Sequence, residues 1–141
     1  MKGLPALART GTAGVVVASA VALAGPDYAK SRHPAVRAMA GFACHDGELC
    51  LYQDWGGQGF MLVLRVGQHV NDLATIKCRG CRGGTFDNQM TSFINKTDRV
   101  WYWYYNARGT GSQRPMGQTG NQPYNISGPD NDQASSVYWW R

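Results

Sequence analysis

The chain has 141 residues, enough for one domain with a modest core, and a formal net charge of +5. Its basic residues are scattered, with Arg79 and Arg82 close together, so no stripe of positive charge could follow a phosphate backbone. Length, composition and charge therefore indicate one small domain and argue against a nucleic-acid-binding protein.

Residues 1–24 have the pattern of a secretory signal peptide. Lys2 and Arg9 supply its positive start, residues 12–23 form an apolar run of mostly small side chains, and residues 22–24 are Ala-Leu-Ala, an A-x-A cleavage site. The run is too short to cross a hydrocarbon core about 30 Å thick, and Gly11, Gly14 and Gly25, in or beside the run, fit a buried core helix poorly. We therefore expect a secreted, extracellular protein that has no membrane segment after cleavage and a net charge lowered by the two lost cations to +3.

The rest of the chain divides into a leader and one domain. Residues 25–41 contain two prolines and several alanines and basic residues without a clean period, which predicts a flexible leader. From residue 42 to residue 141 the composition changes, because this part holds every aromatic residue of the chain except Tyr28 and many glycines. We predict one folded domain over residues 42–141.

The predicted elements of this domain are strands. Short β-type runs occur in chain order at 49–52, 60–66 and 100–105, with turn-forming segments at 55–59 and 106–111. Each glycine costs about 1 kcal/mol relative to alanine inside a helix, so long helices would not tolerate this glycine density. The sequence therefore predicts an all-β domain.

Four cysteines lie at positions 44, 50, 78 and 81. Outside the cytoplasm an even number indicates disulfides, and although three pairings are possible we favour the two local ones, Cys44–Cys50 and Cys78–Cys81. The first closes a loop worth about 2 kcal/mol on the chain-entropy model, and the second is worth rather less. Two other roles fit less well: the C-x5-C spacing is wrong for a zinc knuckle, and the Cys-Arg-Gly-Cys segment lacks the βαβ context of a thioredoxin-like site.

The domain contains an internal repeat. Residues 87–92 (Asp-Asn-Gln-Met-Thr-Ser) and 131–136 (Asn-Asp-Gln-Ala-Ser-Ser) align position for position, and each follows an aromatic strand, a glycine-rich turn and a second extended stretch. A repeated unit of about 40 residues usually cannot bury its apolar face alone. We therefore expect two similar all-β halves that pair face to face as a sandwich.

The two hexapeptides are also candidate metal ligands. Their carboxylate, amide and hydroxyl oxygens suit Ca²⁺, which takes about 6–8 oxygen ligands, and one hexapeptide would need a neighbouring turn or water to complete that shell. The alternative is that the same side chains cap turns through hydrogen bonds to the backbone. Two copies at one spacing favour a shared role, and that role is either ion binding or turn architecture.

Both hexapeptides resemble the (N/D)-(N/D)-x-x-(S/T)-S signature of βγ-crystallin domains and match it at every fixed position. The segments 51–57 and 104–111 are similar to the aromatic, glycine-rich hairpins of that family. The resemblance covers residues 42–141 and implies a sandwich of two Greek-key motifs. It also implies two calcium half-sites, with hairpin residues such as Asp54 completing the shell; the half-site residues are Asp87, Asn88, Gln89 and Thr91, and Asn131, Asp132, Gln133 and Ser135.

The segment from Cys44 to Asp54, just after a signal peptide and leader, resembles the opening of the actinobacterial peptidase inhibitors of the Streptomyces metalloproteinase inhibitor type. That family implies a crystallin-like domain with two disulfides that inhibits an extracellular protease, here as a monomer. The candidate inhibitory loop runs from Cys78 through Arg79 and Gly80 to Cys81, pinned by its short disulfide. It is alternatively a plain surface turn, and its Arg-Gly tip replaces the bulky apolar residue that a thermolysin-type pocket favours.

The sequence of the predicted domain contains no recognisable catalytic motif. His45 and His69 are the histidines of the predicted domain, and no H-E-x-x-H or G-x-S-x-G pattern is present, so we predict that the protein is not an enzyme. His45 lies between two bridged cysteines, which suggests a surface turn. A calcium-stabilised extracellular structural protein is a further alternative.

A glycan-binding, cell-wall-binding or killer-toxin-like module is the other alternative, and it depends on the aromatic run at 101–105. Alternation along a strand places Trp101, Trp103 and Tyr105 on one face and Tyr102 and Tyr104 on the other. One face is expected in the core, and the other is a candidate exposed aromatic platform.

Overall fold

The computed structural model describes residues 35–37 and 43–140. The predicted signal peptide lies outside these residues, as does the predicted leader except for its residues 35–37. Those three residues form strand β1 and pair with β3 at the edge of a sheet, so this part of the predicted leader is ordered against the domain. Residues 35–37 and 43–140 contain no helix with the length and hydropathy of a membrane span.

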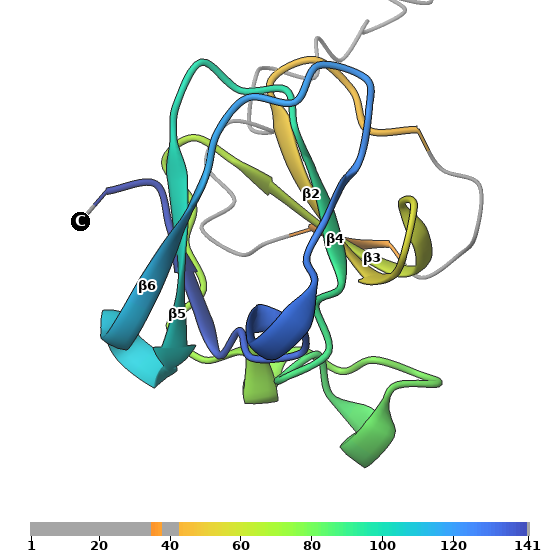
Figure 1. Ribbon diagram of the computed structural model, residues 1–141, viewed down its shortest axis with the longest axis vertical. Helices are drawn as coiled ribbons and strands as arrows, with labels where there is room; N and C mark the ends of the chain where they lie inside the picture. The colour runs from red at the N-terminus through yellow and green to blue at the C-terminus, as the bar shows by residue number, and fades with distance from the viewer. Residues whose placement is uncertain (1–34, 38–42, 141) are drawn as a thin grey trace, which may run out of the picture.

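The domain is all-β, as predicted, and consists of two antiparallel sheets (Figure 1). The first has the strand order β1-β3-β2-β4-β7, with bounds Ala35–Arg37, Gln58–Arg65, Glu48–Asp54, Ser92–Asn95 and Tyr124–Asn125. The second has the order β6-β5-β8, with bounds Thr110–Met116, Trp101–Asn106 and Ser136–Tyr138. Short 3₁₀ turns connect the strands: η2 (Leu73–Thr75), η3 (Arg82–Gly84), η4 (Ala107–Gly109) and η5 (Gly128–Asp130).

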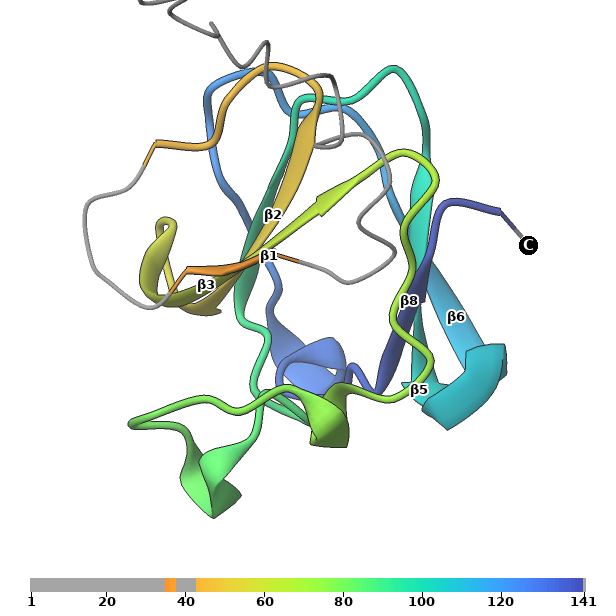
Figure 2. The ribbon, with the colours of Figure 1, turned by 180° about the vertical axis from the view of Figure 1, so that it is seen from behind.

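The two halves of the chain exchange their third extended segments. β7 comes from the second half but pairs with β4 of the first, and Val70 of the first half pairs with Val137 in β8 of the second. The two N–H···O bonds between Val70 and Val137 measure 2.9 and 3.0 Å. Figures 1 and 2 show β5, β6 and β8 gathered on one side of the molecule and β2, β3 and β4 on the other. The halves are therefore intertwined, as two Greek keys, rather than merely stacked.

The main core lies between the two sheets. Leu51 of β2 faces Leu62 of β3 in register, and both are fully buried against Trp101 and Trp103, which are 0% and 2% exposed. A second, smaller cluster covers the opposite face of the first sheet; its buried members are Cys44, Cys50, Tyr52, Met61 and Val63. Because β2 is covered on both faces, it is buried almost continuously rather than at alternate positions.

Candidate functional site

The two hexapeptides occupy equivalent places in the two halves. Asn88 and Asp132 hold the same position in each repeat and both adopt left-handed backbone conformations, with φ of 54° and 57°. Asn and Asp enter this region more readily than other non-glycine residues, which explains the residue types at this position. The Asn88 amide donates to the Ala134 carbonyl at 2.9 Å, and the Asp132 amide donates to the Met90 carbonyl at 3.3 Å. The turns therefore bond to each other reciprocally.

The last serine of each hexapeptide fastens the hairpin of its own half. The Ser92 hydroxyl donates to the last carbonyl of β2 at 2.5 Å and accepts from the Gly57 amide at 3.0 Å. The Ser136 hydroxyl donates to the last carbonyl of β5 at 2.7 Å and accepts from the Gly109 amide at 3.0 Å. The turn-architecture role expected as one alternative is therefore present in both copies.

Glycine is required where each hairpin folds over. Gly59 has φ of 76°, and a Cβ there would collide with the Asp54 carboxylate. Gly111 has φ of 77°, and a Cβ there would lie 2.7 Å from the Asn106 side-chain nitrogen. Asp54 and Asn106 thus have matching positions beneath the two hairpins, which places Asp54 beside its own hairpin turn.

The first residue of each hexapeptide carries a buried oxygen that has no hydrogen-bond partner among the described residues. These atoms are Oδ1 of Asp87 and Oδ1 of Asn131, again at equivalent positions. Between the halves, the Thr91 hydroxyl donates to Oδ1 of Asp132 at 3.1 Å. A buried acceptor without a partner lowers the free energy of unfolding by about 1–3 kcal/mol, and this penalty arises once in each half. These oxygens are hard donors of the kind that Ca²⁺ binds, so the residues fit that ion.

The two glutamines of the hexapeptides are occupied elsewhere. The Gln89 side-chain oxygen accepts from the Arg82 amide at 3.1 Å, and its nitrogen donates to the Asn88 carbonyl at 2.7 Å. The Gln133 side chain donates to the Asn131 carbonyl at 3.3 Å. The Gln89 side-chain oxygen is therefore already used as an acceptor, whereas the bond of Gln133 uses its side-chain nitrogen.

Both favoured disulfides are confirmed. Cys44 is bonded to Cys50 and Cys78 to Cys81, with Cα–Cα separations of 5.9 and 5.4 Å, and no cysteine is free. All four sulfurs are thus used, which leaves no thiolate for the zinc role considered above.

The Cys78–Cys81 loop is a braced projection. Both cysteines are buried while Arg79 and Gly80 are exposed. Figures 1 and 2 show the segment around η3 extending away from the sheets at the lower end of the molecule. The loop is closed by four backbone hydrogen bonds of 3.0–3.3 Å: Phe86 N to Ile76 O, Cys78 N to Gly84 O, Gly84 N to Cys81 O, and Cys81 N to Cys78 O.

Two glutamines brace the loop from outside. The Gln53 side chain on β2 donates to the Gly80 carbonyl at 3.3 Å, and Gln89 of the first hexapeptide accepts from the Arg82 amide. The tip is therefore fixed to one strand and to one of the two repeated turns. Sequence reasoning identified the loop by its cysteines but not these supports, because both contacts join residues that the fold brings together.

The turn between the first two cysteines differs from expectation at Glu48. Its side chain is 1% exposed, bonds to the Arg65 guanidinium at 2.7 Å and lies 3.3 Å from Nδ1 of His45. The surface turn expected around His45 therefore contains a buried carboxylate. The cause is the β2–β3 register, which places Arg65 opposite Glu48.

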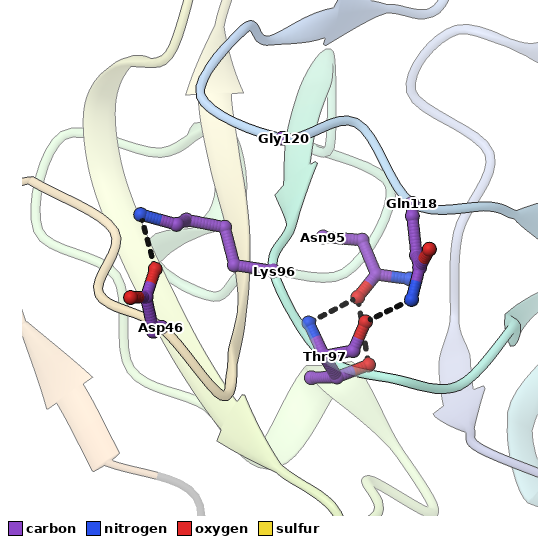
Figure 3. A pocket seen from close by; sticks show the side chains of 6 residues that line it. All are labelled: Asp46, Asn95, Lys96, Thr97, Gln118 and Gly120. Atoms are coloured by element: carbon purple, nitrogen blue, oxygen red, sulfur yellow. Dashed lines mark hydrogen bonds and ion pairs between the residues drawn. The ribbon is translucent and has the colours of Figure 1, made fainter.

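The polar side chains that line a shallow open groove at the other end of the first sheet bond to one another in two groups (Figure 3). Asn95 Oδ1 accepts from the Thr97 amide and hydroxyl at 3.0 and 2.8 Å, and Gln118 donates to the Thr97 carbonyl at 2.8 Å. Lys96 pairs with Asp46 at 2.7 Å, and this contact lowers the pKa of the Asp46 carboxyl. These polar side chains of the groove are thus engaged with one another.

The expected aromatic platform is mostly covered. Trp101 and Trp103 share one face, as alternation predicted, and that face lies in the core, but Tyr104 on the opposite face is only 8% exposed. The edge of its ring meets Tyr138 of β8, with ring centroids 5.7 Å apart. Two residues beyond the end of β8, Trp140 is 43% exposed and packs against Tyr138.

The fold is that of βγ-crystallin domains. A solved structure described as "Evolution of the eye lens beta-gamma-crystallin domain fold" aligns with a TM-score of 0.54 at 18% identity, over 76% of this chain and all of the other. A βγ-crystallin from Ciona intestinalis aligns with a TM-score of 0.51 at 22% identity, over 67% of this chain and all of the other. At these identities the likeness establishes the fold alone.

The sequence defines the class of protein more narrowly. The model of peptidase inhibitor family I36 matches residues 37–116, and the chain belongs to that family. It is accordingly a peptidase inhibitor on a βγ-crystallin fold and not an enzyme, as predicted. No curated protein matches the chain.

Proposed function

We propose that the protein is a secreted, monomeric inhibitor of an extracellular protease, and that the Cys78–Cys81 loop is the surface that enters the protease. The observation that carries this proposal is that the loop projects from the domain and is held rigidly from behind. Arg79 and Gly80 are exposed at the tip, while a disulfide, a ladder of backbone bonds and two glutamine contacts hold the loop from behind.

A rigid loop favours binding because any part of the loop that is mobile before binding must be ordered in the complex. Immobilising a side chain at an interface costs about 0.5–1.5 kcal/mol, and a loop already held in place avoids much of this loss. The shallow groove at the other end of the sheet offers no comparable feature, since its polar groups pair with each other. The loop is therefore the better inhibitory surface.

The deciding experiment is an inhibition assay with the purified, oxidised domain against thermolysin-like, subtilisin-like and trypsin-like proteases. We expect one class to be slowed at micromolar or lower inhibitor. If none is slowed, and the protein instead binds cell-wall glycan through its Trp140 side, the glycan-binding alternative replaces this proposal.

We also propose that the two hexapeptides bind calcium. The paired unpartnered oxygens of Asp87 and Asn131, together with the Thr91 hydroxyl and the Asp132 carboxylate, support two half-sites of the same construction. Main-chain carbonyls of the turns would add further ligands. Extracellular calcium modules commonly bind at about 0.1–1 mM, which suits a secreted protein.

Calcium binding is tested by thermal unfolding in millimolar Ca²⁺ and in EDTA. Calcium at one hundred times its dissociation constant would add about 2.7 kcal/mol to the free energy of unfolding. The double variant Asp87→Ala, Asn131→Ala should abolish the shift, whereas the exposed substitution Ser112→Ala should keep it. No shift in the native protein, or a shift that persists in the double variant, would contradict the proposal.

A further inference from the structure

Three cations surround the proposed inhibitory loop and are left without acidic partners. Lys77, Arg79 and Arg82 are all exposed, and within residues 43–140 none of them forms an ion pair. Elsewhere in the domain, Arg65 and Lys96 each lie 2.7 Å from a carboxylate oxygen. The tip of the loop is thus a positive surface whose charges are not neutralised by residues 43–140.

Arg79 lies at the tip of this positive surface. The Cys81 amide donates to the Cys78 carbonyl at 3.3 Å, which makes residues 78–81 a β-turn with Arg79 and Gly80 at its centre. Gly80 has φ of 94°, the left-handed value that a type II turn requires at its third residue. The Arg79 side chain therefore leaves the turn at its apex, with the disulfide behind it.

We propose that Arg79 fills the primary specificity pocket of a protease that cleaves after arginine and carries a carboxylate in that pocket. A guanidinium forms two parallel hydrogen bonds with a carboxylate, whereas an apolar pocket would bury the cation unpaired. This inference rests on the proposed function and deepens it, because it assigns the class of the target. It favours a protease with an acidic pocket over the metalloprotease that the family resemblance suggests.

The β-turn also explains why the loop would inhibit the protease instead of being cleaved by it. An extended peptide pairs with its partner as an added strand, but a β-turn closed by its own hydrogen bond does not present such a strand. The Arg79–Gly80 bond is held in that turn by the Cys78–Cys81 disulfide and by the bond from Gln53 to the Gly80 carbonyl. The bond therefore stays intact while Arg79 occupies the pocket.

Opening the disulfide should convert the inhibitor into a substrate. Without the cross-link the segment can extend, and the protease then adds water across the Arg79–Gly80 amide. The products are a new carboxyl group on Arg79 and a new amino group on Gly80, so mass spectrometry identifies the cut. The variant Cys78→Ser, Cys81→Ser is expected to be cleaved at this bond, while the oxidised native protein remains whole.

The experiment compares inhibition constants of the oxidised protein against a trypsin-like serine protease and a thermolysin-like metalloprotease. Arg79→Ala should weaken inhibition of the arginine-cleaving enzyme by at least about 30-fold, as expected for a central arginine at an interface. Arg79→Leu should weaken it similarly, and Arg79→Lys less. Arg99→Ala, an exposed cation outside the loop, is the matched control and should leave inhibition unchanged. Circular dichroism and the melting temperature show that each variant folds.

The outcomes separate the two proposals. If no protease class is inhibited, the proposed function and this inference fail together. If only the metalloprotease is inhibited, or if Arg79→Ala inhibits the arginine-cleaving enzyme as well as the native protein does, the assignment of Arg79 is overturned while the proposed function stands.

Discussion

The two halves of the domain share a framework but differ in the segment before each hexapeptide. Leu73 and Ile126 are equivalent, because each donates its amide to the penultimate residue of the opposite hexapeptide at 2.8 Å. Thirteen residues lie between Leu73 and Asp87, whereas four lie between Ile126 and Asn131. The additional residues of the first half form the braced disulfide loop. The framework is therefore duplicated, and the proposed inhibitory feature belongs to one half alone.

The second half fixes its short connection by charge instead of by a disulfide. Asp130 in η5 accepts from the Arg114 guanidinium of β6 at 2.8 Å and from the Tyr105 hydroxyl of β5. Figure 1 shows η5 lying close against the body of the molecule, whereas η3 extends beyond it. The same position in the fold thus carries a packed connection in one half and an exposed tip in the other.

The largest expected effect comes from opening each disulfide separately. One disulfide should contribute mainly to stability and the other mainly to inhibition. Cys44→Ser with Cys50→Ser should lower the free energy of unfolding by about 2 kcal/mol, and inhibition per folded molecule should persist. Cys78→Ser with Cys81→Ser should cost less stability, since its loop is shorter, but should abolish inhibition. Urea unfolding and an inhibition assay on both variants measure this; the reverse assignment of effects would contradict the division between framework and loop.

The duplicated framework predicts equal effects from its two serines. Ser92→Ala and Ser136→Ala each remove one donor and one acceptor and leave a glycine amide, that of Gly57 or Gly109, without its partner. We expect each to lower the free energy of unfolding by about 1–3 kcal/mol. Ser112→Ala, exposed in β6, is the control with no expected effect. A loss of stability from one substitution without a similar loss from the other would show that the two serines are not equivalent.

The smallest effect concerns Asp130 and depends on pH. Hydrogen bonds from Arg114, and then from Tyr105, hold the pKa of its carboxyl below the usual 3.8. A carboxyl with a lowered pKa stabilises the fold above its unfolded pKa and loses that contribution as the pH falls through its folded pKa. Asp130→Asn should therefore be slightly less stable than the native protein at pH 6, and the difference should shrink as the pH falls below the usual carboxyl pKa of 3.8. Urea midpoints across this range measure the effect, and a difference that grows in acid would contradict it.

The sequence was sufficient to predict the features that depend on local spacing. The repeated hexapeptides, the glycine-rich hairpins and the local cysteine pairs each lie within a few residues, so their chemistry is visible along the chain. The matching backbone conformations of Asn88 and Asp132 follow from that repetition. Strand alternation placed Trp101 and Trp103 on one face, and the structure shows that this face is the buried one.

Features that depend on pairing between distant segments could not be predicted. Glu48 is buried because β2–β3 register sets Arg65 opposite it, and Tyr104 is covered because β8 returns beside β5. The exchange of β7 and Val70 between the halves likewise depends on contacts that no local pattern records. In the candidate site, the residues were predicted, but the bracing by Gln53 and Gln89 was not.

The most direct test removes the loop tip and leaves the framework intact. Lys77 and Thr85 face each other as antiparallel bridge partners, so residues 78–84 can be replaced by an Asn-Gly hairpin turn that joins them. Phe86, fully buried beside Phe60, is kept. The account predicts that this variant gives the same far-ultraviolet circular dichroism and cooperative unfolding as the native protein but no longer inhibits its protease. A folded variant that inhibits as strongly as the native chain would contradict it.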